Sequence, residues 1–153
     1  MTKITLDNEY RAIESLIEGK YPTLKVLSYN PVEPEVNTVV FELLPSSTEE
    51  KNRAIVERLR TYQLLFYFDK TATAMTFHSN IDSLFEETSS IPCQDRFIKV
   101  QRHSMSRIFS TTGGKQGFYC IVEASYHSGR TFVQAPKMQE ITHKMNGIET
   151  IIN

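Results

Sequence analysis

The chain has 153 residues, of which 40% are hydrophobic and 23% charged, and its formal net charge is -1. This length fits one domain, and this composition is that of a globular protein and excludes a disordered chain. The lack of a basic excess argues against nucleic-acid binding, in which contacts to phosphate dominate the affinity.

The N-terminus has no basic stretch followed by an apolar one, which argues against a signal peptide. No apolar run approaches the ~18 residues needed to span a bilayer. The two cysteines, Cys93 and Cys120, are too few for a disulfide scaffold, and we interpret them as free thiols in a reducing compartment. We therefore expect a protein made in the cytosol, without a membrane segment.

In the first part of the chain, apolar residues recur at steps of three and four from Thr5 to Lys20, which predicts a helix. Two short strands are expected at Leu24 to Tyr29 and at Asn37 to Leu44. Pro31 and Pro34 mark an exposed turn between these two strands.

The stretch that follows is ambiguous, because Glu49 to Arg60 has a helical composition whereas Leu59 to Phe68 is aromatic and β-prone. We predict a mobile charged loop and then one long strand from about Ala54 to Phe68. A helix over Thr48 to Leu59 is the alternative.

From about Thr73 to Thr88, apolar residues again recur at helical spacing, which predicts a second helix. A hairpin follows, with arms at Arg96 to Phe109 and Gly117 to His127 and a turn that contains Gly113 and Gly114. Both faces of its second arm are partly apolar, so we expect one face to cover the helices and the other to meet something else. A last short helix is expected from Pro136.

The elements therefore run as helix, three strands of antiparallel type, helix, two strands, helix, with no repeats and no linkers. We predict a single α+β domain over residues 1–153. Its mostly antiparallel sheet of about five strands carries helices packed on it.

No motif of nucleophilic, metal-dependent or nucleotide-dependent catalysis occurs in the sequence. Cys120 alternates with apolar residues and is expected in the core, whereas Cys93 in a loop would need a cation such as Arg96 to become a nucleophile. The histidines are expected to be surface or half-buried polar residues, with one at a helix start and one at a strand end: His78, His103, His127 and His143. We expect no catalytic residue, no metal site and no cofactor.

A dense mixed-charge segment leads into the long strand, and it is either a soluble loop or a contact arm for a neighbouring subunit. Exposed Tyr62, Phe66 and Phe68, or their partners on the other face, would form the apolar centre of such an interface. The glycine pair before Lys115 lies between two strands, so it predicts a hairpin turn and no phosphate loop. The candidate assembly interface comprises Glu49, Glu50, Lys51, Arg53, Arg58, Arg60, Gly113, Gly114 and Lys115.

Six segments follow one another along the chain in a familiar order. They are the N-terminal helix, Val39-Val-Phe-Glu-Leu-Leu-Pro-Ser-Ser47, Arg58-Leu-Arg-Thr-Tyr62, Leu64-Leu-Phe-Tyr-Phe68, Gly117-Phe-Tyr-Cys-Ile-Val-Glu-Ala-Ser-Tyr126 and Pro136-Lys-Met-Gln-Glu140. This order resembles that of the tail terminator proteins of long-tailed phages and prophage tail-like particles of Gram-positive bacteria. The resemblance covers nearly the whole chain, and its motifs are individually degenerate. In place of the glycine-containing approach that this family often has before the long strand, this chain has Ala54-Ile-Val56.

The resemblance implies a structural virion protein of the tail or neck. It would form a ring of six copies on the finished tail tube, stop polymerisation of the tube protein and offer a surface to the head-to-tail connector. A different neck or head-closure protein is the first alternative. The second is a small cytosolic enzyme or ligand-binding domain, for which His103, Arg107 and Glu123 would have to converge in a pocket.

Overall fold

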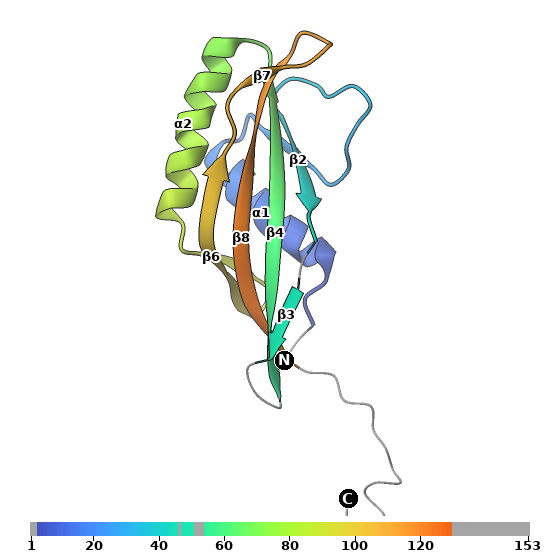
Figure 1. Cartoon of the computed structure of the whole chain (residues 1–153), viewed down its shortest axis with the longest axis vertical. Helices are drawn as coiled ribbons and strands as arrows, with labels where there is room; N and C mark the ends of the chain where they lie inside the picture. Colours follow the sequence, from blue (N-terminus) through green and yellow to red (C-terminus); the bar gives the residue numbers. More distant parts are fainter. Residues whose placement is uncertain (1–2, 46, 51–53, 130–153) are drawn as a thin grey trace, which may run out of the picture.

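The computed structural model describes residues 3–45, 47–50 and 54–129, and in them two helices pack on one face of an eight-stranded sheet (Figure 1). The mixed α+β architecture is as predicted, but the sheet has more strands than the five expected. The elements are α1 (Leu6–Lys20), β1 (Lys25–Leu27), β2 (Thr38–Leu43), β3 (Ser47–Glu50), β4 (Ile55–Phe68), α2 (Thr71–Glu87), β5 (Ser90–Cys93), β6 (Arg96–Met105), β7 (Phe109–Ser110) and β8 (Gln116–Gly129).

Helix α1 begins where the sequence predicts. The side chain of Thr5 accepts a hydrogen bond from the backbone N–H of Asn8, and the Asn8 side chain accepts one from the backbone N–H of Thr5, so each caps the other. Ile13 and Ile17 are fully buried on its inner face. The helix ends at Lys20, where Tyr21 donates its backbone N–H to the Ile17 carbonyl and Pro22 follows.

Strands β1 and β2 occupy the two places expected for them, but they pair in parallel, with Lys25 opposite Thr38 and Leu27 opposite Val40. The expectation of three antiparallel strands is wrong for this pair. The loop between them holds Pro31 and Pro34 and returns the chain to the same end of the sheet. Asn37 closes the loop with a φ of 59°, a conformation that asparagine tolerates better than most residues.

The long strand is confirmed as β4, which pairs along its whole length with β8, from Ile55 opposite Gly129 to Phe68 opposite Gln116. The helical alternative over Thr48 to Leu59 is wrong. Part of the expected charged loop is strand β3, which pairs antiparallel with Val56 to Leu59 of β4. The ladder with β4 outweighs the helical composition of this stretch.

Helix α2 begins two residues earlier than expected and ends one residue earlier. His78 lies in its interior and not at its start, and an imidazole nitrogen lies 2.8 Å from the carbonyl oxygen of Ser106. The helix packs Ala74, Ile81 and Phe85 against the sheet.

The predicted hairpin is present as β6, β7 and β8, and the sheet order is β1-β2-β4-β8-β6-β5. Its turn closes with hydrogen bonds between Thr111 and Lys115, and Gly114 has a φ of +83°, which glycine adopts without strain. Strand β5, which the sequence did not predict, forms the far edge beside β6. The helix expected from Pro136 lies outside the described residues.

The core is rich in aromatic side chains between the sheet and the helices. The rings of Phe66 and Phe118 stack at 4.7 Å and those of Phe68 and Phe77 at 4.8 Å. Tyr62, Phe66 and Phe68 are each 0% exposed. These three residues therefore belong to the core, and the expectation that they are exposed at the centre of an interface is wrong. That their partners on the other face form such a centre stays a prediction.

Candidate assembly interface

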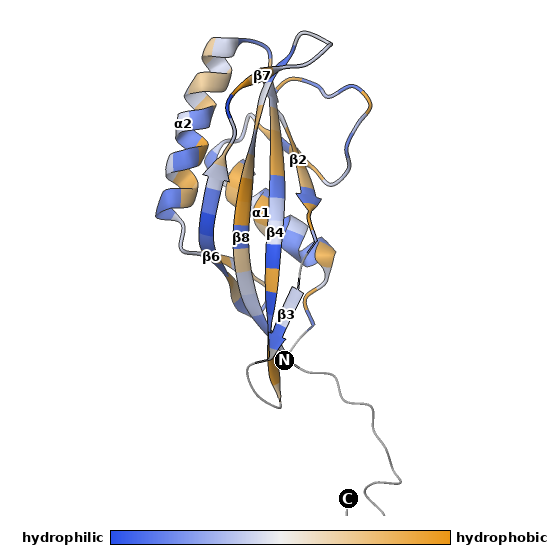
Figure 2. Cartoon of the chain, in the orientation of Figure 1, coloured by the Kyte–Doolittle hydropathy of each residue, from blue (hydrophilic) through white to orange (hydrophobic). Residues whose placement is uncertain are grey.

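The sheet is covered by helices on one face only. Neighbouring residues of a strand point to opposite faces. The residues of β4 and β8 that alternate with the buried ones therefore point away from the helices. On this open face Leu59, Leu65 and Ile121 are partly exposed, among polar residues such as Gln63 and Glu123. Figure 2 shows polar and apolar residues interleaved along these two strands. The expectation that one face of β8 lies against the helices is confirmed, and the expectation that its other face meets something else stays a prediction.

One end of the sheet extends beyond the helices and forms what we call the tip, which comprises β3, Ile55–Leu59 of β4 and the end of β8. In Figure 1 it lies at the lower end of the long axis, below both helices. Glu49 is exposed on β3, and Glu50 pairs through its backbone with Val56. Arg58 is partly exposed in the middle of the tip. Lys51 and Arg53, also candidate contact residues, lie outside the described residues.

Arg60 differs from the other candidate residues, because its side chain is held on the helix-covered face. One guanidinium nitrogen, Nε, lies 3.0 Å from a carboxylate oxygen of Glu9, and a second, Nη2, donates to the other Glu9 oxygen at 3.1 Å. Only 20% of the Arg60 side chain is exposed, and Glu9 is 0% exposed. Arg60 therefore joins β4 to α1 and does not form part of a free surface at the tip.

Two tyrosines complete this buried cluster. The hydroxyl of Tyr62 donates to Glu9 at 2.7 Å and that of Tyr126 at 3.2 Å, so the carboxylate is fully hydrogen-bonded as a buried charge requires. Burial and the neighbouring Glu9 carboxylate raise the pKa of Tyr62 far above its usual range. Burial lowers the pKa of Arg60, but the Tyr126 hydroxyl and the Glu9 charge outweigh that and raise it, so the guanidinium stays charged.

Sequence reasoning missed this cluster, although a signal was present. Glu9 stands three residues after Leu6 and four before Ile13, which places it on the apolar face of α1. A carboxylate at that place in a helix needs a buried partner. Arg60 and Tyr62 both point to the helix side of β4, but their pairing with Glu9 across fifty residues has no local signature.

The glycine turn, with Gly113, Gly114 and Lys115, lies at the other end of the long axis from the tip (Figure 1). It adjoins the loop of β1 and β2, and together they line a hollow of about 300 Å³. In that loop Val32 is fully exposed. The candidate residues of the two segments therefore form two separate surfaces and not one.

The three polar residues that the sequence offers for a ligand-binding site do not converge. The His103 ring faces α2, where a ring nitrogen lies 2.8 Å from an Asp82 carboxylate oxygen. Glu123 lies on the open face and is paired at 2.7 Å with Arg102, whose hydrogen bond lowers the pKa of Glu123. The trio of His103, Arg107 and Glu123 is therefore not a site.

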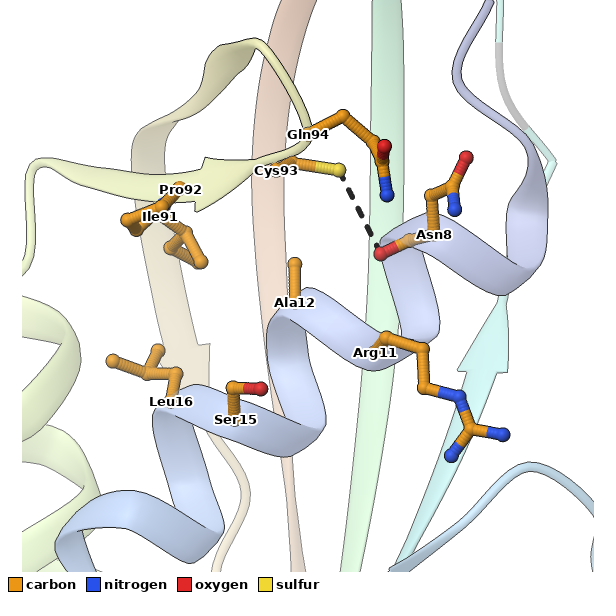
Figure 3. A pocket seen from close by; sticks show the side chains of 9 residues that line it. All are labelled: Asn8, Arg11, Ala12, Ser15, Leu16, Ile91, Pro92, Cys93 and Gln94. Atoms are coloured by element: carbon orange, nitrogen blue, oxygen red, sulfur yellow. Dashed lines mark hydrogen bonds between the residues drawn. The ribbon is translucent and has the colours of Figure 1, made fainter.

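Both cysteines are buried free thiols. Cys93 lies at the end of strand β5 and not in a loop, and its thiol lies 3.6 Å from the Asn8 carbonyl oxygen, over a groove between α1 and β5 (Figure 3). Burial raises the pKa of Cys93, and the positive charge of Arg96 lowers it by less. Burial raises the pKa of Cys120 to about 12. Neither thiol has the lowered pKa of a nucleophile.

Within residues 3–45, 47–50 and 54–129, no three His, Cys, Asp or Glu side chains come together in a way that could hold a metal ion. Neither α1 nor α2 is long and apolar enough to cross a membrane.

Comparison with known proteins does not assign the chain to a family. No family model and no curated protein matches the chain. Chains of solved structures do match, and one of them aligns over 86% of this chain and 100% of its own length, with 11% identity and a TM-score of 0.49. No functional argument rests on a likeness of this degree.

Proposed function

We propose that this protein is a phage tail terminator, which caps the finished tail tube as a ring of six copies and offers the joining surface for the head. One observation carries the proposal beyond the resemblance in sequence. The molecule has an open sheet face, and its two candidate contact segments lie at opposite ends of its long axis. It can therefore meet several neighbours at once without using a catalytic group.

A ring needs an interface in which one surface of a copy meets a different surface of the next. Separate surfaces at the tip and at the glycine turn suit such contacts, and they leave room for the tube protein and the connector as further partners. The near-neutral charge of the chain is compatible with DNA passing through a ring without sticking to it. In this role the protein acts in the virion, has no enzymatic activity and needs no cofactor.

Deletion of the gene from its phage or prophage tests the proposal. Overlong tails without heads in electron micrographs are the expected result, because nothing stops the tube or joins it to a head. Tails of normal length without heads would favour the alternative role of a neck or head-closure protein. Normal infectious particles would end both proposals.

A single substitution tests whether the tip is the contact surface. Arg58→Glu reverses a partly exposed charge there and is expected to reduce the yield of complete particles at least tenfold, with an unchanged melting temperature. Glu86→Lys is the matched control, because Glu86 is exposed on α2, outside both candidate contact segments, and its reversal is expected to leave the yield as it was. A normal yield for Arg58→Glu would remove the tip from the interface. Arg60→Glu is unsuitable, since the new carboxylate would face Glu9 and destabilise the fold.

A further inference from the structure

The loop between β1 and β2, residues 28–37, presents apolar side chains to solvent. It holds three of the six large hydrophobic residues that are exposed in the described part of the chain: Tyr29, Val32 and Val36. The loop also carries Glu33 and Glu35 and no basic residue, and neither carboxylate forms an ion pair within the described residues. Single exposed hydrophobic residues are common, but a group of them indicates a contact surface.

This loop is fixed at its end and stiffened in its middle. At its end, the hydroxyl of Thr38 donates to the carbonyl oxygen of Glu35 at 2.6 Å. In its middle, Pro31 and Pro34 restrict the backbone on either side of the fully exposed Val32. A loop that is ordered before it binds loses little conformational entropy on contact, so Val32 can serve as an anchor for a partner.

The outer edge of β1, where this loop begins, is closed to a neighbouring strand. The backbone N–H of Val26 donates to the Glu18 carboxylate at 2.9 Å, and the Val26 carbonyl accepts from the Tyr10 hydroxyl at 2.8 Å. Glu18 and Tyr10 thus occupy the backbone groups that an added strand would use. A contact made by this loop therefore has to form through its side chains.

A hollow of about 220 Å³ lies beside the tip, at the end of the long axis away from the loop (Figure 1). Phe97 borders this hollow with 59% of its surface exposed. Because Ile98 is fully buried under the helices, its neighbours Phe97 and Lys99 on β6 point to the open face of the sheet. The lining residues come from β4, β6 and β8: Glu57, Arg96, Phe97, Lys99, Ser125, Tyr126 and His127.

The charges around this hollow are complementary to those of the loop. Lys99 is exposed and forms no ion pair within the described residues. Arg96 is held in the wall, where it lies 3.1 Å from an Asp95 carboxylate oxygen and donates to the His127 carbonyl at 2.7 Å. The lining carboxylate, Glu57, lies two strands from Lys99, roughly 10 Å away at the usual strand spacing. An acidic side chain can therefore reach Lys99 without meeting Glu57.

We propose that the loop of one copy docks in this hollow of a second copy, with Val32 against Phe97 and the acidic pair Glu33 and Glu35 beside Lys99. Both surfaces have exposed apolar groups next to charges of opposite sign, a combination that suits an interface with an apolar centre and a polar rim. The two surfaces differ and lie at opposite ends of the molecule. Each copy can therefore bind one neighbour with its loop and another with its hollow.

This contact would join copies in the proposed ring, and to that extent it rests on the proposed function. Association of the purified protein tests the contact, whereas deletion of the gene tests the function, so either can fail alone. Species that stop at six copies would agree with the ring. Chains that lengthen with concentration would keep the contact and count against the ring.

Two variants that each lack one side of the contact test the proposal by sedimentation velocity on the full-length protein. The concentrated unsubstituted protein is expected to associate, whereas Val32→Asp in the loop and Phe97→Asp in the hollow each give monomers with an unchanged melting temperature. An equal mixture of the two variants is expected to form dimers and nothing larger, because each pair of unlike copies retains one intact loop and one intact hollow.

Met75→Asp is the matched control, because Met75 is 58% exposed on α2, outside both surfaces, and this variant should associate like the unsubstituted protein. A monomeric unsubstituted protein would overturn the proposal. So would a mixture that contains only monomers, or normal association of either variant alone.

An exchange of charges gives a second readout, which tests the pairing of the loop with Lys99. Lys99→Glu is expected to weaken association at least tenfold, since its new carboxylate faces the acidic pair of the neighbouring loop. Glu33→Lys and Glu35→Lys, added to the same chain, should restore most of the lost association. Unchanged association of Lys99→Glu, or a loss that the exchange does not restore, would contradict the pairing.

Discussion

The two halves of β4 share one backbone ladder but differ in what covers them. Both pair with β8 without a break. From Tyr62 onward, every second residue is buried beneath the helices, whereas each residue from Ile55 to Thr61 is partly exposed. Pairing with β8 is therefore enough to keep both halves of β4 in a strand, and the cover of the helices determines which half becomes part of the core.

The composition of the two halves agrees with this division. The half under the helices supplies Leu64, Phe66 and Phe68 to the core, whereas the other half carries Glu57 and Arg58 in the tip and Arg60 just before it. Among these charged residues, Arg60 stands at the boundary, where its ion pair with Glu9 links the strand to α1. The two halves should therefore respond very differently to mutation.

The largest expected difference comes from truncating one side chain in each half. Phe66→Ala removes a fully buried ring stacked on Phe118 and is expected to lower the free energy of unfolding by about 4 kcal/mol. Leu59→Ala, at a partly exposed position of the tip, is expected to lower it by about 1 kcal/mol. Urea denaturation of both variants measures the contrast. Equal losses would mean that the tip is as well packed as the core.

A smaller effect is expected at the boundary between the halves. Glu9→Gln removes the charge that Arg60 and two tyrosines bind, and because the partners stay buried it should cost about 3 kcal/mol of unfolding free energy. The control is Glu123→Gln, which breaks the exposed ion pair with Arg102 and should leave the urea midpoint unchanged. If Glu9→Gln were as stable as the unsubstituted protein, the cluster would not join helix and strand.

Some elements of the fold were predictable from the sequence, and others were not. Helix α1 and the hairpin were predictable, because a capping residue, a regular apolar spacing and a glycine turn are local signals. Strands β3 and β5 are four residues each and exist through their neighbours, which no local pattern records. The buried state of Tyr62, Phe66 and Phe68 was missed because alternation shows that a strand has two faces, but not which face the helices cover.

For the candidate interface the sequence located charged residues but not their surroundings. Arg58 and Arg60 are identical in type and two positions apart, and only the second finds a buried carboxylate. Their different roles depend on where the first turn of α1, which carries Glu9, lies against the sheet, and this is a property of the packed molecule.

The smallest expected effect is a dependence of the folded protein's stability on pH, and it arises from a thiol buried beside the covered half of β4. Burial raises the pKa of Cys120 from 9.0 to about 12 in the folded protein. An unfolded chain therefore loses the thiol proton first, so stability is fully present below about pH 9 and declines as the pH rises toward 12. The decline is about 1.4 kcal/mol per pH unit above the pKa of the unfolded thiol, so it amounts to about 1 kcal/mol by pH 10.

Thermal unfolding between pH 8.5 and 10 checks this prediction. Cys120→Ala removes the group and should flatten the decline relative to the unsubstituted protein, even if its own stability is lower throughout. Parallel curves for the two proteins would show that the thiol is not protected by burial. Tyrosines with raised pKa values contribute only at still higher pH.

The way Glu18 and Tyr10 occupy the backbone of Val26 has a consequence for the protein at high concentration. Sheets with exposed edge strands can pair edge to edge and form fibrils. The side chains of Glu18 and Tyr10 on α1 block such pairing at strand β1. Replacing Glu18 by a shorter residue would expose the backbone N–H of Val26 and make the edge of β1 a site at which aggregation can begin. The Glu18 carboxylate thus helps to prevent neighbouring copies of the protein from aggregating through the edge of β1.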